Sequence, residues 1–263
     1  MNHIENYYCN YDEDGRLGYK WGQVEFLTTM RYITKYLEQT PNAQVLEIGA
    51  GTGRYSRTIA DMGYHVSAVE LVQHNINVFK SQITPTQNIS ISQGNALDLN
   101  MLADNTFDIT LVLGPMYHLY TDSDKQQAIS EALRVTKFGG IVFVAYCISD
   151  ASILEDAFKN NMLMISDCMD KGQIDPITFD TTSLPESIFE LVRKADIDRL
   201  MANFKVERLH YVATDMISRF IRESISDMDD KTFDLYLQFH YAVCERPDMV
   251  GMTHHSLDIF RKV

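Results

Sequence analysis

A glycine-rich turn carries the clearest chemical signal in this sequence of 263 residues. Residues 45–53 read V-L-E-I-G-A-G-T-G, an apolar run followed by alternate glycines. Glycines at this spacing let a chain turn sharply from a strand into a helix and let a ligand approach the backbone, although a purely structural turn is the alternative. A dinucleotide fingerprint, G-x-G-x-x-G, needs a glycine at position 54, where this chain has Arg54. The turn therefore departs from that fingerprint and reads E-x-G-x-G-x-G.

Two carboxylates accompany the turn. Glu70 ends the next apolar run, and a carboxylate there can accept hydrogen bonds from both hydroxyls of a ribose. An ordinary polar strand end is the alternative for Glu70. Glu47 lies inside a strand that should be buried, where an unpaired carboxylate is costly. We expect it either to bond backbone amides of the glycine turn or to reach the amino group of a bound cofactor through water.

The turn belongs to a regular alternation of short apolar runs and helix-period segments between residues 44 and 146. Such alternation indicates βαβ units and a parallel sheet. Strands are predicted at 44–48, 65–70, 88–92, 107–113 and 140–146, and helices at 24–38, 54–62, 72–83 and 122–136. The predicted fold class is α/β, a doubly wound and mostly parallel sheet of about seven strands with helices on both faces.

The pattern changes after Cys147. We predict a Met-rich helix at 150–168, a turn-rich stretch at 171–185, helices at 186–203 and 231–244, and strands at 205–213 and 256–262. The sheet thus continues to the last residues, with two insertions near 147–185 and 215–253. Insertions after strand ends often build substrate pockets, so we expect them to form a helical cap. We divide the chain into an N-terminal helical lid segment, 1–40, and a main domain, 41–263, that carries both insertions.

Six landmarks in order resemble the Rossmann-like class I S-adenosylmethionine-dependent methyltransferases of the type 11 group. They are the turn from Glu47 to Gly53, Glu70, Gln93-Gly94-Asn95-Ala96-Leu97, Phe107-Asp108, Leu113-Gly114-Pro115-Met116-Tyr117-His118-Leu119, and Leu133-Arg134-Val135-Thr136-Lys137-Phe138-Gly139-Gly140. The resemblance covers residues 43–146. The 113–119 segment and the C-terminal G-M-T-H-H-S-L-D-I-F-R-K also resemble a small bacterial group within that class, for which we know no substrate. The resemblance implies S-adenosylmethionine as cofactor and S-adenosylhomocysteine as product. The net charge of −13, the lack of a Lys/Arg-rich run and the two insertions favour a small molecule, enclosed by the N-terminal segment and the insertions, as methyl acceptor.

The resemblance also implies which residues hold the cofactor. They are Glu47, Gly49, Ala50, Gly51, Gly53, Glu70, Leu71, Asn95, Ala96, Leu113 and Gly114. Asn95 stands where the family commonly has an acidic residue beside the adenine. Its amide oxygen can still accept from the adenine amino group, so this departure weakens one contact only.

His118 is the first candidate for a catalytic residue, since it follows a strand whose carboxyl end borders the ligand crevice. A neutral imidazole can take a proton from a hydroxyl or amine acceptor. Tyr117 is a similar candidate, and packing or helix capping is the alternative for both. Tyr7, Tyr8 and Tyr11 precede the first long helix and are expected to line the acceptor site, with plain surface packing as the alternative.

Two other functions fit the same sheet. One is an NAD(P)-dependent oxidoreductase, which Arg54 in the fingerprint disfavours. The other is a catalytically silent cofactor-binding protein that regulates a partner. Methyl transfer needs little covalent chemistry from side chains, because proximity and desolvation supply most of the acceleration. The lack of an obvious catalytic pair therefore does not argue against an enzyme.

Composition excludes several classes of protein. Apolar residues make up 45% and charged residues 22%, which is ordinary for a globular chain, and the net charge of −13 disfavours nucleic acid as a partner. The longest apolar run, 141–148, is too short to span a bilayer, and the acidic N-terminus is unlike a signal peptide. Four scattered cysteines without a C-x-x-C pair suit a reducing compartment, so we expect a cytoplasmic protein that meets no membrane. His254 and His255 are adjacent and have no evident partner, so no metal site is expected.

Overall fold

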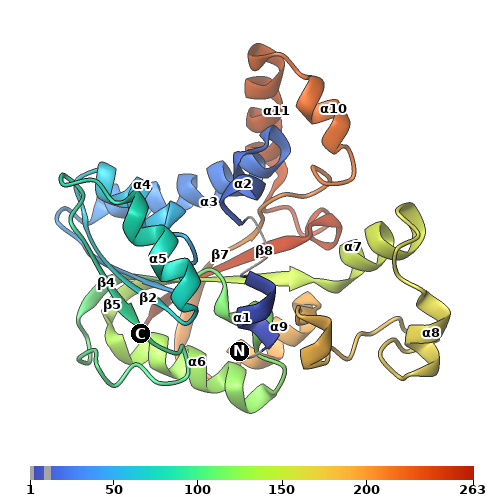
Figure 1. Cartoon of the computed structure of the whole chain (residues 1–263), viewed down its shortest axis with the longest axis horizontal. Helices are drawn as coiled ribbons and strands as arrows, with labels where there is room; N and C mark the ends of the chain where they lie inside the picture. The colour runs from blue at the N-terminus through green and yellow to red at the C-terminus, as the bar shows by residue number, and fades with distance from the viewer. Residues whose placement is uncertain (1–2, 9–12) are drawn as a thin grey trace.

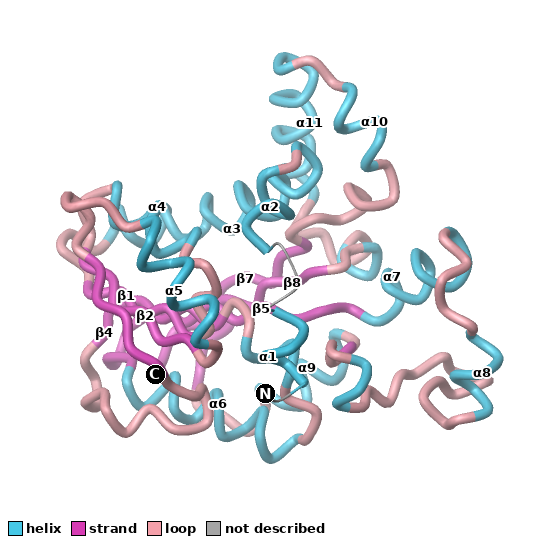
Figure 2. The backbone as a smooth tube through the Cα atoms, viewed as in Figure 1, coloured by secondary structure: helices cyan, strands magenta, loops and turns pink. Residues whose placement is uncertain are grey.

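The computed structural model describes residues 3–8 and 13–263 and builds them around one mixed sheet (Figures 1 and 2). The strand order is β3-β2-β1-β4-β5-β8-β7, and the two-residue strand β6 pairs with β5 off this path. The strands are β1 Gln44–Ile48, β2 His65–Glu70, β3 Ile89–Gln93, β4 Phe107–Val112, β5 Thr136–Ile148, β6 Leu191–Val192, β7 Val206–Ala213 and β8 His255–Lys262. Only β8 runs antiparallel to its neighbours, β5 and β7. The predicted Rossmann-like, mostly parallel sheet of seven long strands is confirmed.

Helices cover both faces of this sheet. Figure 1 shows α3, α4 and α5 on one side and α6 and α9 on the other. The helices are α1 His3–Tyr8, α2 Glu13–Gly18, α3 Lys20–Gln39, α4 Arg54–Asp61, α5 Gln73–Gln82, α6 Asp122–Val135, α7 Ser149–Ile153, α8 Ile165–Asp170, α9 Lys194–Met201, α10 Arg222–Asp227 and α11 Asp230–Val243. Within residues 3–8 and 13–263, no helix combines the length and the apolar character needed to cross a bilayer.

Parallel pairing brings the chemistry to one edge of the sheet. β1 pairs with β2 and with β4, so that Ile48 lies opposite both Val69 and Val112. β1 and β4 are nearly all buried, because helices cover both faces and leave no polar side for alternate residues. The carboxyl ends of three central strands therefore meet at the turn that starts with Gly49.

Two predicted helices are wrong in part. The Met-rich helix expected at 150–168 is split into α7, a π-helix (Leu154–Lys159) and α8, and Asn161 between them has a left-handed φ of 52°. The helix expected at 186–203 covers only α9. Before it, β6 pairs with Cys147 and Ile148 of β5, a partner far away in sequence. That pairing satisfies backbone groups that a helix would otherwise have bonded locally.

The glycine turn closes by contacts that no larger residue allows. Gly49 donates its backbone N–H to Val69 O at 2.8 Å and has φ of 72°. A Cβ on Gly49 would lie 2.6 Å from Cδ of Pro115, and a Cβ on Gly53, where φ is 81°, would lie 2.1 Å from the Phe79 ring. The turn and the start of α4 therefore pack directly on the segment after β4 and on α5.

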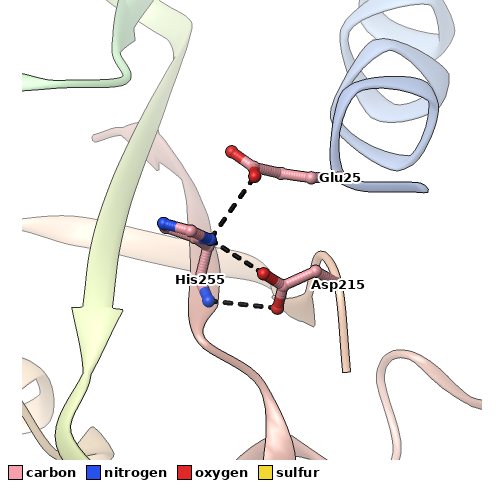
Figure 3. A group of neighbouring side chains, drawn as sticks. All are labelled: Glu25, Asp215 and His255. Atoms are coloured by element: carbon pink, nitrogen blue, oxygen red, sulfur yellow. Dashed lines mark hydrogen bonds and ion pairs between the residues drawn. The ribbon is translucent and has the colours of Figure 1, made fainter. Parts of the chain in front are cut away.

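A buried ionic triad joins α3 to the ends of β7 and β8 (Figure 3). Nδ1 of His255 lies 2.8 Å from Asp215 Oδ2 and 3.4 Å from Glu25 Oε2. Burial lowers the pKa of His255, but the two carboxylates outweigh it and raise that pKa to about 10. The same imidazolium and the surrounding hydrogen bonds hold the pKa of Asp215 far below its usual range despite its burial. His255 is therefore a fixed cation between two anions.

We predict that Gly53→Ala destabilises the protein more than Gly172→Ala does. Both positions have positive φ, 81° and 69°, but a Cβ meets nothing within 4 Å at Gly172 and meets Phe79 at Gly53. Backbone strain should therefore lower the free energy of unfolding by about 1 kcal/mol in each variant. The clash with Phe79 should lower it by a further amount on the order of 2 kcal/mol in Gly53→Ala only. Urea denaturation measures the free energy of unfolding of both variants. Equal decreases would show that α5 moves to accommodate the new methyl group.

The triad predicts a pH dependence of stability. The pKa of His255 is about 10 in the folded chain and about 6.5 when unfolded. The contribution of His255 to the free energy of unfolding is therefore fully present below about pH 6.5 and is lost as the pH rises through 10. The contribution of Asp215, whose folded pKa is depressed, is present above about pH 4 and is lost in acid. Glu25→Gln should flatten the decline of the unfolding free energy between pH 7 and 10, measured by urea denaturation. Glu207→Gln, at an exposed ion pair with Arg261, is the control and should keep the wild-type slope; identical slopes in all three proteins would contradict the triad's role.

Candidate active site

A cleft of about 330 Å³ lies where β1, β2 and β4 end. Most of the predicted cofactor residues line it. They are Glu47, Gly49, Ala50, Gly51, Glu70, Leu71, Asn95, Ala96, Leu113 and Gly114. Gly53 does not line the cleft and instead packs under the Phe79 ring. The structure thus gathers residues from four loops that are distant in sequence.

Glu70 holds the floor of the cleft. One carboxylate oxygen accepts from the Gly51 N–H at 2.9 Å, and the other accepts from Val72 N–H at 2.9 Å and from the Asn75 side chain at 3.2 Å. Burial raises the pKa of Glu70, and these hydrogen bonds counter part of that rise. A carboxylate so placed both orders the turn and borders the space in which a ribose would lie.

Glu47 and Asn95 have partners that the sequence did not indicate. Glu47 does not bond the glycine turn; it accepts a hydrogen bond from the Ser56 hydroxyl in α4. Complete burial raises its pKa to about 8. The Asn95 amide oxygen accepts from Leu97 N–H at 3.0 Å, which fixes the side chain at the cleft wall.

His118 forms a short chain of hydrogen bonds at the edge of the cleft. Its Nδ1 lies 2.8 Å from the Ile188 carbonyl, and its Nε2 lies 2.8 Å from the Tyr8 hydroxyl. A carbonyl only accepts, so Nδ1 carries the proton and Nε2 of the neutral ring accepts from Tyr8. Burial lowers the pKa of His118, which favours that neutral ring. The imidazole is therefore held as a base directed at the hydroxyl of Tyr8.

The Ile188 carbonyl is a site element that sequence analysis missed. Ile188 has φ of 66°, a left-handed conformation that is strained for a β-branched residue. Its carbonyl also accepts from the Tyr120 hydroxyl at 2.6 Å, and the next residues hydrogen-bond to the His118 segment through Glu190 N–H and Tyr117 O at 2.6 Å. No local pattern in the sequence marks Ile188, which falls within the helix predicted at 186–203.

A second cavity, of about 600 Å³, adjoins the cleft. Tyr8 and Tyr117 line both spaces, and Tyr7 lines the second cavity. The remaining lining includes Trp21, Phe189, His254 and His255. Residues of both insertions also line it: Cys147, Ser152, Ile153, Asp156, Leu163, Cys168, Gln173, Ile174, Thr181, Thr182, Ser183, Arg219 and Arg222. Tyr11, which was also predicted to line the acceptor site, lies outside the described residues.

The expectation that His255 has no partner is wrong, because the fold supplies Glu25 and Asp215. Among residues 3–8 and 13–263, these three side chains are the group whose ligand-type atoms lie within 4.8 Å of one another. The 2.8 Å contact between His255 Nδ1 and Asp215 is that of a charge-assisted hydrogen bond from the imidazolium to the carboxylate, which suits a structural triad. His254 pairs instead with Glu155. Both histidines line the second cavity. Adjacent residues within one strand would point to opposite faces, but His254 lies before the first residue of β8.

The cleft fits an S-adenosyl group. Nothing lies within 4 Å of the position that a Cβ on Gly51 would occupy, so the backbone there is open to a ligand. The Glu70 carboxylate and the Asn95 side chain border the same space from the ends of β2 and β3. The Leu113–Gly114 segment faces them from the end of β4.

Comparison with known proteins agrees with this geometry. The family model described as a methyltransferase domain matches residues 46–144. A demethylmenaquinone methyltransferase of Renibacterium salmoninarum is 34% identical over 116 residues, 44% of this chain and 46% of that protein. Phosphoethanolamine N-methyltransferase 1 of Caenorhabditis elegans is 24% identical over 63% of this chain and 33% of its own length. The alignments therefore span less than half of these curated relatives.

The fold is shared over a longer stretch than the sequence. A solved SAM-dependent methyltransferase from Methanosarcina mazei superposes with a TM-score of 0.57 over 88% of this chain and 97% of that one, at 15% identity. The matched family model, the strand order and the cleft at the glycine turn agree with one another. Residues 46–144 thus match the methyltransferase domain family, and the chain around them has the Rossmann-like fold of a solved S-adenosylmethionine-dependent methyltransferase.

Proposed function

We propose that this protein transfers the methyl group of S-adenosylmethionine to a small-molecule acceptor bound in the second cavity. The observation that carries the proposal is the junction of the two spaces at Tyr8 and Tyr117, with His118 beside it. A methyl donor in the cleft and an acceptor in the second cavity would meet at that junction. The protein's task is then to hold the two in line and to exclude water.

The side chains at the junction provide a route for one proton. S-adenosylmethionine, when bound, supplies a methyl group already activated by its sulfonium. His118 Nε2 takes the proton that a hydroxyl or amine acceptor must lose, through the Tyr8 hydroxyl to which it is hydrogen-bonded. The Ile188 carbonyl holds Nδ1–H and thereby orients the ring. Glu70, Asn95 and the glycine turn hold the cofactor.

The acceptor is enclosed by the N-terminal segment and the two insertions. α1 places Tyr7 and Tyr8 at the second cavity, and the insertions contribute most of the remaining wall. We propose that residues 1–40 act as a lid on this basis. The relatives named above are a demethylmenaquinone methyltransferase and a phosphoethanolamine methyltransferase, whose names point to small acceptors. The net charge of −13 further disfavours a nucleic acid acceptor.

Transfer of a labelled methyl group tests the proposal directly. The protein is incubated with S-adenosylmethionine carrying a tritiated methyl group and with fractions of a small-molecule extract, and S-adenosylhomocysteine is measured. We expect binding of both cofactor forms with dissociation constants around micromolar, a typical range near working concentrations, and product formation with at least one fraction. Cofactor binding without transfer to any fraction would favour a silent regulatory protein instead. Tight binding of NAD(P) and none of S-adenosylhomocysteine would favour an oxidoreductase.

Glu70→Ala should weaken S-adenosylhomocysteine binding at least about tenfold, because a hydrogen bond to a charged group contributes about 1.5–3 kcal/mol. Isothermal titration gives the affinity. Glu70→Gln, which keeps one acceptor oxygen, should lose less. Glu207→Ala, at an exposed ion pair with Arg261, is the matched control. An unchanged affinity in folded Glu70→Ala would mean that other groups hold the ribose.

His118→Gln should lower the rate of transfer about a hundredfold, a common contribution of a general base, and leave cofactor affinity unchanged. Tyr8→Phe should have a similar effect, since it removes the hydroxyl and keeps the ring. Because burial lowers the pKa of His118, the wild-type rate should be flat at neutral pH and fall only on the acid side, as the ring becomes protonated. His74→Asn, on the exposed face of α5, serves as control. An acid limb that persists in His118→Gln would assign the base elsewhere.

A further inference from the structure

One wall of the second cavity is cationic and takes no part in the proton route described above. It consists of Arg219, Arg222 and His254, all packed around Glu155, which is only 1% exposed. Arg222 Nη2 donates to one Glu155 oxygen, and the other oxygen lies 3.3 Å from Arg219 Nε and 2.9 Å from His254 Nε2. The carboxylate thus lies behind these three side chains, which line the cavity.

Positive charge exceeds negative charge at this wall. Three basic side chains contact Glu155: Arg219 and Arg222, which line the cavity, and Lys159, whose Nζ lies 3.9 Å from the carboxylate. Asp156 is the other acidic residue beside them. Burial raises the pKa of Asp156, and the neighbouring arginines oppose that rise. Such an excess is notable in a chain of net charge −13, where a cationic wall is not a consequence of composition.

The wall also has unused hydrogen-bond donors. Among the described residues, the side chain of Arg222 donates only to Glu155, and Arg219 Nε meets no acceptor with hydrogen-bond geometry. Among the same residues, neither ring nitrogen of His254 has a partner with hydrogen-bond geometry, although Nε2 lies 2.9 Å from Glu155 and the residue is only 2% exposed. Buried polar groups are nearly always hydrogen-bonded in folded proteins, so the unpaired ring of His254, a residue that lines the cavity, leaves a hydrogen-bond position for a ligand to fill.

The backbone that presents Glu155 is itself unusual. Residues Leu154–Lys159 form a π-helix, a rare element that is frequent at functional sites. Its wide turn places Glu155 inward and Asp156 at the cavity. The ordinary α-helix predicted at 150–168 would not contain this wide turn.

We propose that Arg219, Arg222 and His254 bind an anionic group of the methyl acceptor, a carboxylate or a phosphate. This inference rests on the proposed function, because it takes the second cavity to be the acceptor site. Guanidinium groups match both anions with paired N–H donors. The aromatic residues Tyr7, Tyr117 and Phe189 on the other part of the wall would pack on the apolar body of the same molecule.

The single tryptophan of the chain, Trp21, lines the second cavity and reports on its occupancy. The protein with bound S-adenosylhomocysteine is titrated with benzoate and with phenyl phosphate, and the change in Trp21 fluorescence is followed. Benzyl alcohol is the neutral analogue and benzylamine the cationic one. We expect at least one of the two anions to bind about tenfold more tightly than benzyl alcohol, given the strength of charged hydrogen bonds. The ratio of benzoate to phenyl phosphate affinity then distinguishes a carboxylate subsite from a phosphate subsite.

Arg219→Gln and Arg222→Gln should each abolish most of the preference for the anion. Because Arg222→Gln leaves Glu155 short of a partner, the double variant Glu155→Gln with Arg222→Gln, which removes both charges, is measured as well. Arg246→Gln is the matched control, since that arginine is exposed, pairs with Asp248 and lies outside the cavity lining. Thermal unfolding and S-adenosylhomocysteine affinity establish that each variant is folded.

Four outcomes would overturn the anion subsite. The first is equal affinity for the anions and benzyl alcohol, and the second is no response to either anion. The third is tighter binding of benzylamine, which would assign recognition to Asp156. The fourth is retained anion preference in the folded arginine variants. Each outcome leaves S-adenosylhomocysteine binding and methyl transfer intact as separate measurements, so a failure here is distinct from a failure of the methyltransferase proposal.

Discussion

Asp215 ties together the two ends of the 215–253 insertion, and the wall of the second cavity depends on this contact. Its Oδ1 accepts from the Thr253 hydroxyl at 2.6 Å and from the backbone N–H groups of His254 and His255 at 2.9 and 3.1 Å. A buried carboxylate without such partners would cost several kcal/mol. Asp215, just after β7, is thereby joined to the start of β8. The segment between them folds outward as α10 and α11 (Figure 1). His255 in turn packs its ring 5.9 Å from that of Tyr117, at the junction with the cleft.

Glu70 has a comparable double role in the cleft. Its carboxylate holds the N–H groups of Gly51 and Val72, and it borders the space proposed for the ribose. The same charge that would recognise the ligand therefore also fixes the turn that receives it. Such coupling keeps the site rigid without a ligand, at the expense of burying a carboxylate whose pKa is raised by desolvation. Pre-formed sites of this kind lose little entropy when they bind.

The sequence predicted the sheet closely and the insertions poorly. The expected strands 44–48 and 65–70 have the observed bounds, and the others differ at most by a few residues at their ends. Buried parallel strands carry continuous apolar runs that are visible locally. The segment expected as a helix at 186–203 instead contains β6, whose partner in β5 is some forty residues away in sequence. Hydrogen bonds to a distant strand leave no periodic signal in the segment that makes them.

The sequence by itself determined the fold class and the glycine turn, and it singled out Glu70 and His118 as candidates, because these follow from local periodicity and motif spacing. Only the tertiary structure decided what each of them contacts. The Ile188 carbonyl orients His118, Ser56 pairs with Glu47, and Glu25 with Asp215 fixes the charge of His255. The physical reason is that hydrogen bonds and ion pairs act over a few ångströms in space, and the residues that meet at this distance come from elements whose separation along the chain carries no information about their contact.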